Sequence, residues 1–300
     1  MSKTRDINKP GNARTRLRQL LKDGGTLVAP GAMDPLSALL IEHLGFRAIY
    51  LGGLVIAARL GTSEQTLSMS ESVEAARLIT RVTRTPLIVD AEAGFGDAIQ
   101  VERTVSEFEA AAVAAIHLED AHFPVRMQAN PMISLEAMVT KIRVARATRS
   151  DPDFILIART EAWGAPGGGI DEVRRRLSAY ADAGADALIP MVFDREQAAR
   201  IGEEFRGLPL VYFAASRRDP LPELSAAGAA EMGYQIVIYP AIGMGVAAAS
   251  IISAYSRLRD EGHTGLAIAT QTEAWQRILA VTRAPQRVQL ENEASKGLTG

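Results

Sequence analysis

The chain has 300 residues, of which 47% are hydrophobic and 23% charged, and its 33 basic and 35 acidic residues leave a net charge of -2. This balance creates no global field toward nucleic acid or anionic membranes, so no such partner is expected. No apolar run approaches the roughly 20 residues that cross a bilayer, and the first residues contain no apolar signal core. We therefore expect a cytoplasmic protein without a membrane partner. The absence of cysteine excludes disulfides, thiolate metal sites and cysteine-based catalysis.

The N-terminal segment, residues 1–22, is predicted to form a basic arm and a first helix. It carries seven basic side chains opposed only by Asp6. A solvated arm is the simpler interpretation of this charge, and a binding role is the alternative.

Beyond it, short β-branched runs alternate with longer segments of helical period. The eight predicted strands are Thr26–Pro30, Arg47–Leu51, Pro86–Asp90, Ala115–Glu119, Phe154–Ala158, Asp186–Pro190, Pro209–Phe213 and Gln235–Tyr239. The helices predicted between them include Glu71–Arg84, Ala98–Ala112, Ser134–Arg149, Ile170–Ala183 and Asp194–Phe205. Eight such units predict an α/β fold, the TIM (β/α)8 barrel, as a single domain over residues 1–300. An open doubly wound sheet is the alternative, but the glycine-rich fingerprint that normally follows its first strand is absent.

Two further helices are predicted after the eighth strand, at Met244–Glu261 and Gly265–Arg283. Eight strands need only one closing helix. The surplus in residues 243–300 is therefore expected to pack against a neighbouring subunit, so the chain is predicted to be a homo-oligomer.

Acidic side chains gather at the carboxyl ends of the third and fourth predicted strands, where the active site of a TIM barrel forms. Asp90, Glu92 and Glu119 would crowd around one spot, and protonation or a cation must relieve their repulsion. Carboxylate oxygens without cysteine favour Mg²⁺, with Mn²⁺ possible. The alternative is that Asp90 and Glu92 cap the next helix or pair with arginines. His117, within the fourth strand, is expected only to pack.

Two further features of the strand ends would bind an anionic ligand. Arg159, at the end of the fifth strand, can clamp a carboxylate or phosphonate through paired hydrogen bonds. The backbone amides of Gly52, Gly53 and Leu54 can hold a second carboxylate without supplying charge. A simple tight turn is the alternative for these glycines.

At these residues the sequence resembles the isocitrate lyase and phosphoenolpyruvate mutase superfamily, from about Leu27 to Tyr255. The most specific matching motifs are Val89-Asp90-Ala91-Glu92-Ala93-Gly94-Phe95-Gly96, Leu118-Glu119-Asp120 and Ile157-Ala158-Arg159-Thr160-Glu161-Ala162. The resemblance implies a magnesium-dependent TIM barrel that makes or breaks C–C or P–C bonds next to a carboxylate, through a pyruvate-type enolate. It also implies a tetramer that exchanges a C-terminal helix.

The resemblance also implies residue roles. Asp90 is the expected direct metal ligand, and Glu92, Glu119 and Glu64 are expected to hold the metal's waters. Gly52, Gly53 and Leu54, with Asp90 and Arg159, are expected to contact the substrate. Arg159 and Glu119 are the expected catalytic groups beside the developing oxyanion.

The departures from the superfamily pattern narrow the expected activity. The loop after the fourth strand lacks the cysteine with which isocitrate and methylisocitrate lyases protonate the enolate. His122 is the titratable group that could replace it, although a structural role is the simpler interpretation, and Arg126 could act as an anion lid. Met191 and Phe213 stand where lyases often place glutamate and asparagine, which favours a smaller or more apolar substituent on the substrate.

Taken together, these residues predict a Mg²⁺-dependent carbon–carbon lyase, a decarboxylase or retro-aldol enzyme, acting on a small 2-oxo or 2-hydroxy dicarboxylate. A phosphonopyruvate mutase or hydrolase is the first alternative. A barrel that binds a carboxylate without turnover is the second.

Overall fold

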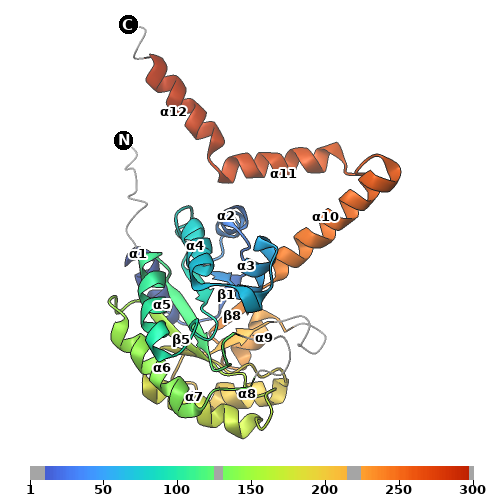
Figure 1. Cartoon of the computed structure of the whole chain (residues 1–300). Helices are drawn as coiled ribbons and strands as arrows, with labels where there is room; N and C mark the ends of the chain where they lie inside the picture. Colours follow the sequence, from blue (N-terminus) through green and yellow to red (C-terminus); the bar gives the residue numbers. More distant parts are fainter. Residues whose placement is uncertain (1–10, 125–130, 215–223, 297–300) are drawn as a thin grey trace.

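The computed structural model describes residues 11–124, 131–214 and 224–296. Its centre is a set of parallel strands surrounded by helices (Figure 1). The strands are β1 (Leu27–Pro30), β2 (Ile49–Leu51), β3 (Leu87–Asp90), β4 (Ala115–Glu119), β5 (Ile155–Arg159), β6 (Ala187–Ile189), β7 (Val211–Phe213) and β8 (Ile236–Tyr239). All eight predicted strands are present. Those predicted to begin at Pro86 and Pro209 begin one or two residues later, in keeping with the missing N–H of proline.

The strands close into a barrel. Strands β2 to β6 pair in chain order, and β8 lies between β1 and β7. Parallel bridges between Gly31 and Tyr50 and between Leu188 and Leu210 join the two sheets at both edges. The predicted TIM-barrel fold is confirmed, and it brings the carboxyl ends of all eight strands to one rim.

The helices of the outer layer begin where local sequence signals favour them. They are α1 (Gly11–Lys22), α2 (Pro35–His43), α3 (Gly53–Leu60), α4 (Met69–Thr80), α5 (Ala98–Ala110), α6 (Leu135–Thr148), α7 (Ile170–Ala183), α8 (Arg195–Glu204) and α9 (Ala226–Glu231). At the start of α4, the Ser68 N–H donates to Glu71 Oε2 at 2.9 Å and the Glu71 N–H donates back to the Ser68 hydroxyl at 3.3 Å. This reciprocal cap fixes the first turn.

Helix α1 closes the end of the barrel opposite the strand carboxyl ends. Leu17 is fully buried in the cluster that fills the barrel interior, together with Ala29, Tyr50 and Ile157. Arg14 anchors the helix, because its Nε donates to the Val113 carbonyl at 2.9 Å, just before β4 begins. Packing and hydrogen bonding therefore seal this end.

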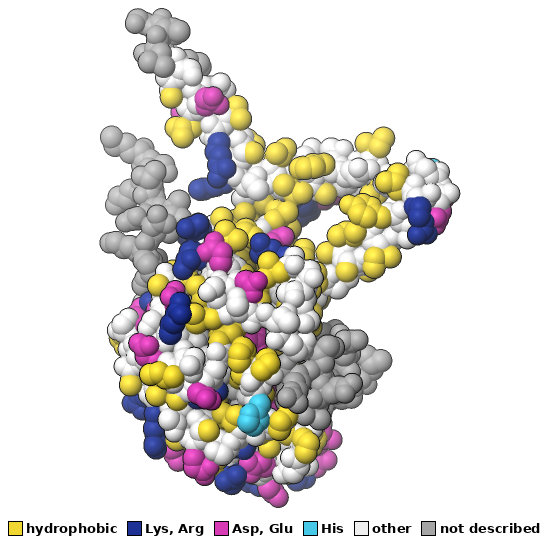
Figure 2. All heavy atoms as spheres, in the orientation of Figure 1, with side chains coloured by type: hydrophobic (Ala, Val, Ile, Leu, Met, Phe, Trp, Pro, Cys, Tyr) yellow, Lys and Arg dark blue, Asp and Glu magenta, His cyan; other side chains and the backbone are white. Residues whose placement is uncertain are grey.

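Three helices follow the barrel: α10 (Ile242–Glu261), α11 (Ile268–Val281) and α12 (Ala284–Lys296). Figure 1 shows α10 leading away from the barrel and α11 turning back, and α11 contacts α2. Neither α10 nor α11 contains a buried residue, and hydrophobic side chains lie along both (Figure 2). On α10, Val246, Ile252 and Tyr255 are 63%, 66% and 67% exposed. Within the described ranges, no helix is long and apolar enough to span a membrane.

Candidate active site

The loop after β3 turns its acidic side chains back over the strand ends. Asp90 ends β3, and Glu92 follows with a backbone φ of 51°. The Glu92 N–H donates to Asp90 Oδ1 at 2.8 Å, and the Glu92 carbonyl accepts the Glu119 N–H at 2.9 Å. Because a left-handed φ is unfavourable for glutamate, these bonds hold a strained turn. This turn places the Glu92 carboxylate near those of Asp90 and Glu119.

Glu64 joins this group from η1 (Glu64–Thr66), the short 3₁₀ helix that follows α3. Carboxylate oxygens of Glu64, Asp90 and Glu92 all lie within 4.8 Å of one another. Gly53 makes the arrangement possible, because a Cβ at this position would lie 1.6 Å from Glu92 Oε1. Clustered carboxylate oxygens are the donors that Mg²⁺ and Mn²⁺ prefer. Glu119, the fourth predicted ligand, lies outside this group of three.

The electrostatics of the four acids call for a positive charge. Burial raises the pKa of Glu119 to about 8, and burial together with Asp90 raises the pKa of Glu64 to about 7. The same two causes raise the pKa of Glu92 well above its usual range. Within the described chain, the buried Oε1 atoms of Glu92 and Glu119 have no hydrogen-bond partner. The donor set therefore fits a hard divalent cation, which would satisfy both oxygens and favour the ionised forms.

Arg159 ends β5 and lies among the acids. Its Nε donates to Glu161 at 2.7 Å, and its Nη2 also contacts that carboxylate. Nη2 lies 3.2 Å from Glu119 Oε2, whereas Nη1 lies 3.6 Å from Asp90 Oδ2. The guanidinium carbon is 5.2 Å from the centroid of the Phe213 ring. Burial alone would lower the pKa of Arg159, but the surrounding carboxylates raise it well above its usual value, so the side chain stays charged.

Two buried side chains beneath Asp90 belong to the site and were not predicted to do so. The Tyr50 hydroxyl lies 2.9 Å from His117 Nε2 and 3.4 Å from Asp90 Oδ2. Burial lowers the pKa of His117 to about 4, so the imidazole is neutral at pH 7. His117 therefore does more than pack. Inward alternation along β2, which places Tyr50 on the same face as Gly52, is the sequence signal that points to Tyr50.

The predicted carboxylate-binding amides lie at the N-terminus of α3. Gly52 and Gly53 are buried and begin the helix, whereas the Leu54 side chain is 52% exposed. The Leu54 backbone N–H forms a hydrogen bond with Glu64, which lowers the pKa of that carboxyl and so opposes the effect of burial. A helix N-terminus favours an anion, and here it lies against the acid cluster.

The remaining predicted residues lie in different surroundings. Met191 is buried just after the end of β6 with a φ of 45°, and Phe213 ends β7 under the Arg159 guanidinium. His122 is exposed, and its backbone N–H donates to the Pro131 carbonyl at 3.1 Å. Arg126, the predicted anion lid, lies outside the described residues.

A buried lysine also supports the acidic loop and was not predicted. Lys141, on α6, is 3% exposed, and its Nζ donates to the Ala93 carbonyl at 2.8 Å. Burial lowers the pKa of this amine, and the charges of Asp97 and Glu119 oppose the shift. The ammonium thus tethers the loop that carries Glu92 to the outer helical layer.

Known proteins resemble this chain in sequence and in fold. The sequence matches the phosphoenolpyruvate phosphomutase family over residues 17–259. The 2,3-dimethylmalate lyase of Eubacterium barkeri is 38% identical over 259 residues, which cover 84% of this chain and 88% of that protein.

Solved structures of similar proteins have the same fold. Oxaloacetate acetylhydrolase in complex with the inhibitor 3,3-difluorooxalacetate superimposes with a TM-score of 0.87 at 30% identity, over 96% of this chain and 99% of that one. Phosphonopyruvate hydrolase in complex with oxalate and Mg²⁺ gives a TM-score of 0.81 at 30% identity, over 94% and 98%.

These matches define an enzyme class built on a parallel α/β barrel. The chain belongs to the phosphoenolpyruvate phosphomutase family, within the PEP mutase/isocitrate lyase superfamily. The predicted superfamily is therefore confirmed.

Proposed function

We propose that this chain is a Mg²⁺-dependent carbon–carbon lyase that cleaves a small 2-hydroxy or 2-oxo dicarboxylate and releases pyruvate or a close analogue. The observation that carries the proposal is the group formed by Glu64, Asp90 and Glu92, whose clustered oxygens lie beside the Arg159 guanidinium. The names of the relatives, a dimethylmalate lyase and an oxaloacetate acetylhydrolase, support this class of substrate.

The residues at the rim have separate roles. Asp90 would bind the cation directly, and Glu64, Glu92 and Glu119 would hold its waters. When bound, Mg²⁺ supplies Lewis-acid polarisation of the substrate's 2-oxygen. Arg159 stabilises the negative charge that develops there as the C–C bond breaks.

The amides at the start of α3 would bind the substrate carboxylate. The peptide N–H groups of Gly53 and Leu54 point from a helix N-terminus, where partial positive charge favours an anion. Glu64 accepts the Leu54 N–H in this structure. A substrate carboxylate would therefore compete with Glu64 for that donor, and a displaced Glu64 would stay within reach of a cation held beside Asp90.

The far wall of the pocket favours an apolar substituent. Met191 and Phe213 present a thioether and a phenyl ring at the ends of β6 and β7. Neither can hydrogen-bond a third carboxylate strongly, and an unpaired buried carboxylate is costly. An alkyl-substituted malate or oxaloacetate therefore suits the pocket better than a tricarboxylate.

A panel of substrates tests the proposal. Purified protein with Mg²⁺ is incubated with oxaloacetate, 2,3-dimethylmalate, methylisocitrate and phosphonopyruvate, while pyruvate and phosphate are measured. Pyruvate release from an alkylmalate or oxaloacetate is expected. Phosphate release would favour phosphonate chemistry, and turnover of none, with oxalate still bound, would favour a carboxylate-binding barrel.

The metal ligands are tested without turnover. Oxalate, an analogue of the pyruvate enolate, should raise the melting temperature only when Mg²⁺ is present. Asp90→Ala should abolish this shift, whereas the control Asp171→Ala, at a side chain that is 95% exposed, should retain it.

The proton donor is proposed to be His122, since the sequence has no cysteine and this histidine lies on the loop after β4. His122→Gln should lower kcat while leaving the Mg²⁺-dependent oxalate shift intact. An unchanged kcat would assign protonation to another group.

The oligomeric state is proposed to be a homotetramer in which residues 243–300 form the subunit interface. The exposed apolar side chains of α10 and α11, including Val246, Ile252 and Tyr255, support contact with another copy. Light scattering after gel filtration should give the mass of four chains. The cytoplasmic location stays a prediction.

A further inference from the structure

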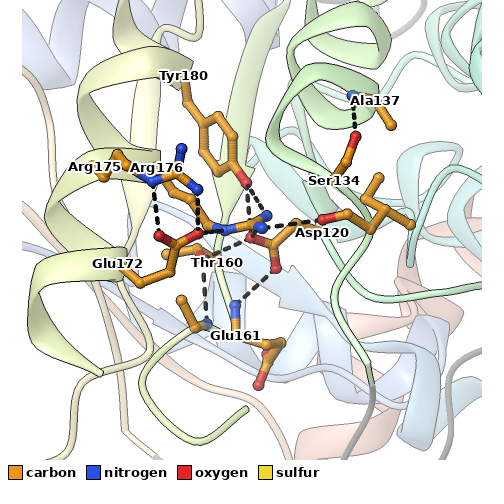
Figure 3. A network of polar contacts seen from close by, with 11 residues as sticks. Asp120, Ser134, Ala137, Thr160, Glu161, Glu172, Arg175, Arg176 and Tyr180 are labelled. Carbon is orange, nitrogen blue, oxygen red and sulfur yellow. Dashed lines mark hydrogen bonds and ion pairs between the residues drawn. The ribbon is translucent and has the colours of Figure 1, made fainter. Parts of the chain in front are cut away.

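A buried polar cluster lies beside the proposed site, between the ends of β4 and β5 and helix α7 (Figure 3). Its centre is Asp120, whose side chain is fully buried. Asp120 Oδ2 accepts hydrogen bonds from the Thr160 hydroxyl at 2.6 Å, the Tyr180 hydroxyl at 2.7 Å and Arg176 Nη1 at 3.0 Å. Asp120 Oδ1 accepts the Glu161 N–H at 2.9 Å. A buried carboxylate with four donors is fully satisfied and holds its partners firmly.

The cluster connects directly to Arg159. The Asp120 N–H donates to the Arg159 carbonyl at 3.2 Å, and Asp120 holds the backbone of Glu161 two residues later. The Glu161 carboxylate is in turn the nearest partner of the Arg159 guanidinium. Asp120 therefore holds the Arg159 carbonyl and the Glu161 N–H, and so fixes the backbone of the two residues that form this ion pair.

Arg159 has competing partners. Glu119 Oε2 and Asp90 Oδ2 lie 3.2 and 3.6 Å from its guanidinium nitrogens. Asp90 is the proposed direct ligand of the cation, so an Arg159 released by Glu161 would move toward a carboxylate that the cation needs. Ion pairs among buried groups are strong enough for such competition to matter.

We propose that Asp120, Arg176 and Tyr180 form a positioning cluster that anchors Glu161, and that the anchored Glu161 keeps Arg159 from closing further onto Asp90 and Glu119, with which it already forms longer ion pairs. The cluster thereby protects metal affinity as well as the direction in which Arg159 points. This inference rests on the proposed metal site and not on which substrate is cleaved.

Manganese binding measured by electron paramagnetic resonance tests the inference without turnover. Tyr180→Phe removes one of four donors to Asp120 and is expected to weaken Mn²⁺ binding about threefold, which is only a part of the strength of a hydrogen bond to a carboxylate, because three donors remain. Asp120→Asn and Glu161→Gln are expected to weaken it about tenfold or more, as for other groups that support metal ligands. Tyr234→Phe is the matched control, since its buried hydroxyl donates to the Ala198 carbonyl on α8 at 3.2 Å, a hydrogen bond outside the Asp120 cluster.

A second set of variants separates positioning from general loosening of the fold. In an Arg159→Gln background no guanidinium can move onto Asp90, so Tyr180→Phe should no longer weaken Mn²⁺ binding. If Asp120→Asn does not fold, Tyr180→Phe and Glu161→Gln carry the test, with their melting temperatures measured in parallel.

The outcomes are distinct. Wild-type Mn²⁺ affinity in both Tyr180→Phe and Glu161→Gln would overturn the positioning role while leaving the proposed lyase intact. Equal weakening with and without Arg159 would also overturn it. Failure of the wild-type protein to bind Mn²⁺ would overturn the metal site, and this inference with it.

Discussion

Replacement of Gly53 by alanine should disable the metal site while leaving the barrel folded. The added Cβ would lie 1.6 Å from Glu92 Oε1 and 3.2 Å from Glu64 Oε1. Carbon and oxygen atoms that are not bonded need roughly 3 Å, so the Glu92 carboxylate must withdraw by more than about 1 Å. The Glu92 carboxylate is the end of a flexible side chain and can rotate aside, but this rotation takes it away from its place beside Asp90 and Glu64.

The expected loss of metal affinity and of activity can be estimated from this displacement. Groups that support metal ligands contribute about 10- to 100-fold to metal affinity or activity, and a misplacement of about 1 Å can cost about 100-fold in rate. We therefore expect Gly53→Ala to weaken Mn²⁺ binding at least about tenfold and to lower kcat/KM about 100-fold. The melting temperature without metal should change little, because the movement is confined to the rim.

The assay compares Gly53→Ala with Gly207→Ala. A Cβ added at Gly207 would meet no atom within 4 Å, and the backbone there is not left-handed, so this variant controls for the added methyl group. Mn²⁺ affinity and the Mg²⁺-dependent oxalate shift are measured for both. Wild-type values in Gly53→Ala would refute the argument that Glu92 must occupy this position for the cation to bind.

Three further predictions concern charge and assembly. Because the pKa values of Glu64 and Glu119 are raised to about 7 and about 8, the metal-free folded protein binds more protons than the unfolded chain between about pH 4.5 and 8. Its unfolding free energy should fall as pH rises through this window, and saturating Mg²⁺ should remove the slope; a flat metal-free profile in urea titrations would contradict the burial of these acids. Lys141→Met should lower the unfolding free energy by about 1–3 kcal/mol, because the buried Ala93 carbonyl loses its donor, and equal or greater stability would show that relief of the buried charge dominates. Ile252→Asp on α10 should give smaller assemblies than wild type in light scattering, with Asp260→Lys on the same helix as control, and an unchanged mass would place the interface elsewhere.

The barrel could be predicted well from the sequence because its signals are local. Apolar runs of three to five residues mark each strand, and small residues with helical spacing mark most of the covering helices. The sequence indicated a helix ending near His43 but not its range, although Asp34 caps helix α2 and Pro35 occupies its first position, because the helix is too short to show a clear helical period. Helix α12 was missed. Two helices were expected after the eighth strand, and the structure contains three.

The candidate site was only partly predictable, for a physical reason. Acids at strand ends can be found because a parallel barrel brings those ends to one rim. The hydrogen bonds of Asp120 instead span 40 to 60 positions, to Thr160 and Tyr180, and nothing local marks them. The role of Gly53 likewise depends on the approach of a carboxylate from a different strand, so the sequence indicated an anion-binding turn but not the close contact.

The seal that α1 forms across the far end of the barrel limits how substrates enter the site and how products leave it. With Leu17 filling the interior from that side and Arg14 tied to the Val113 carbonyl, the described residues leave small molecules no route along the barrel axis. Whatever enters at the rim must also leave there, so the two fragments of a cleaved molecule would share one exit. The outer fragment must depart before the one lying deeper, which predicts ordered release and competition between the last product and fresh substrate.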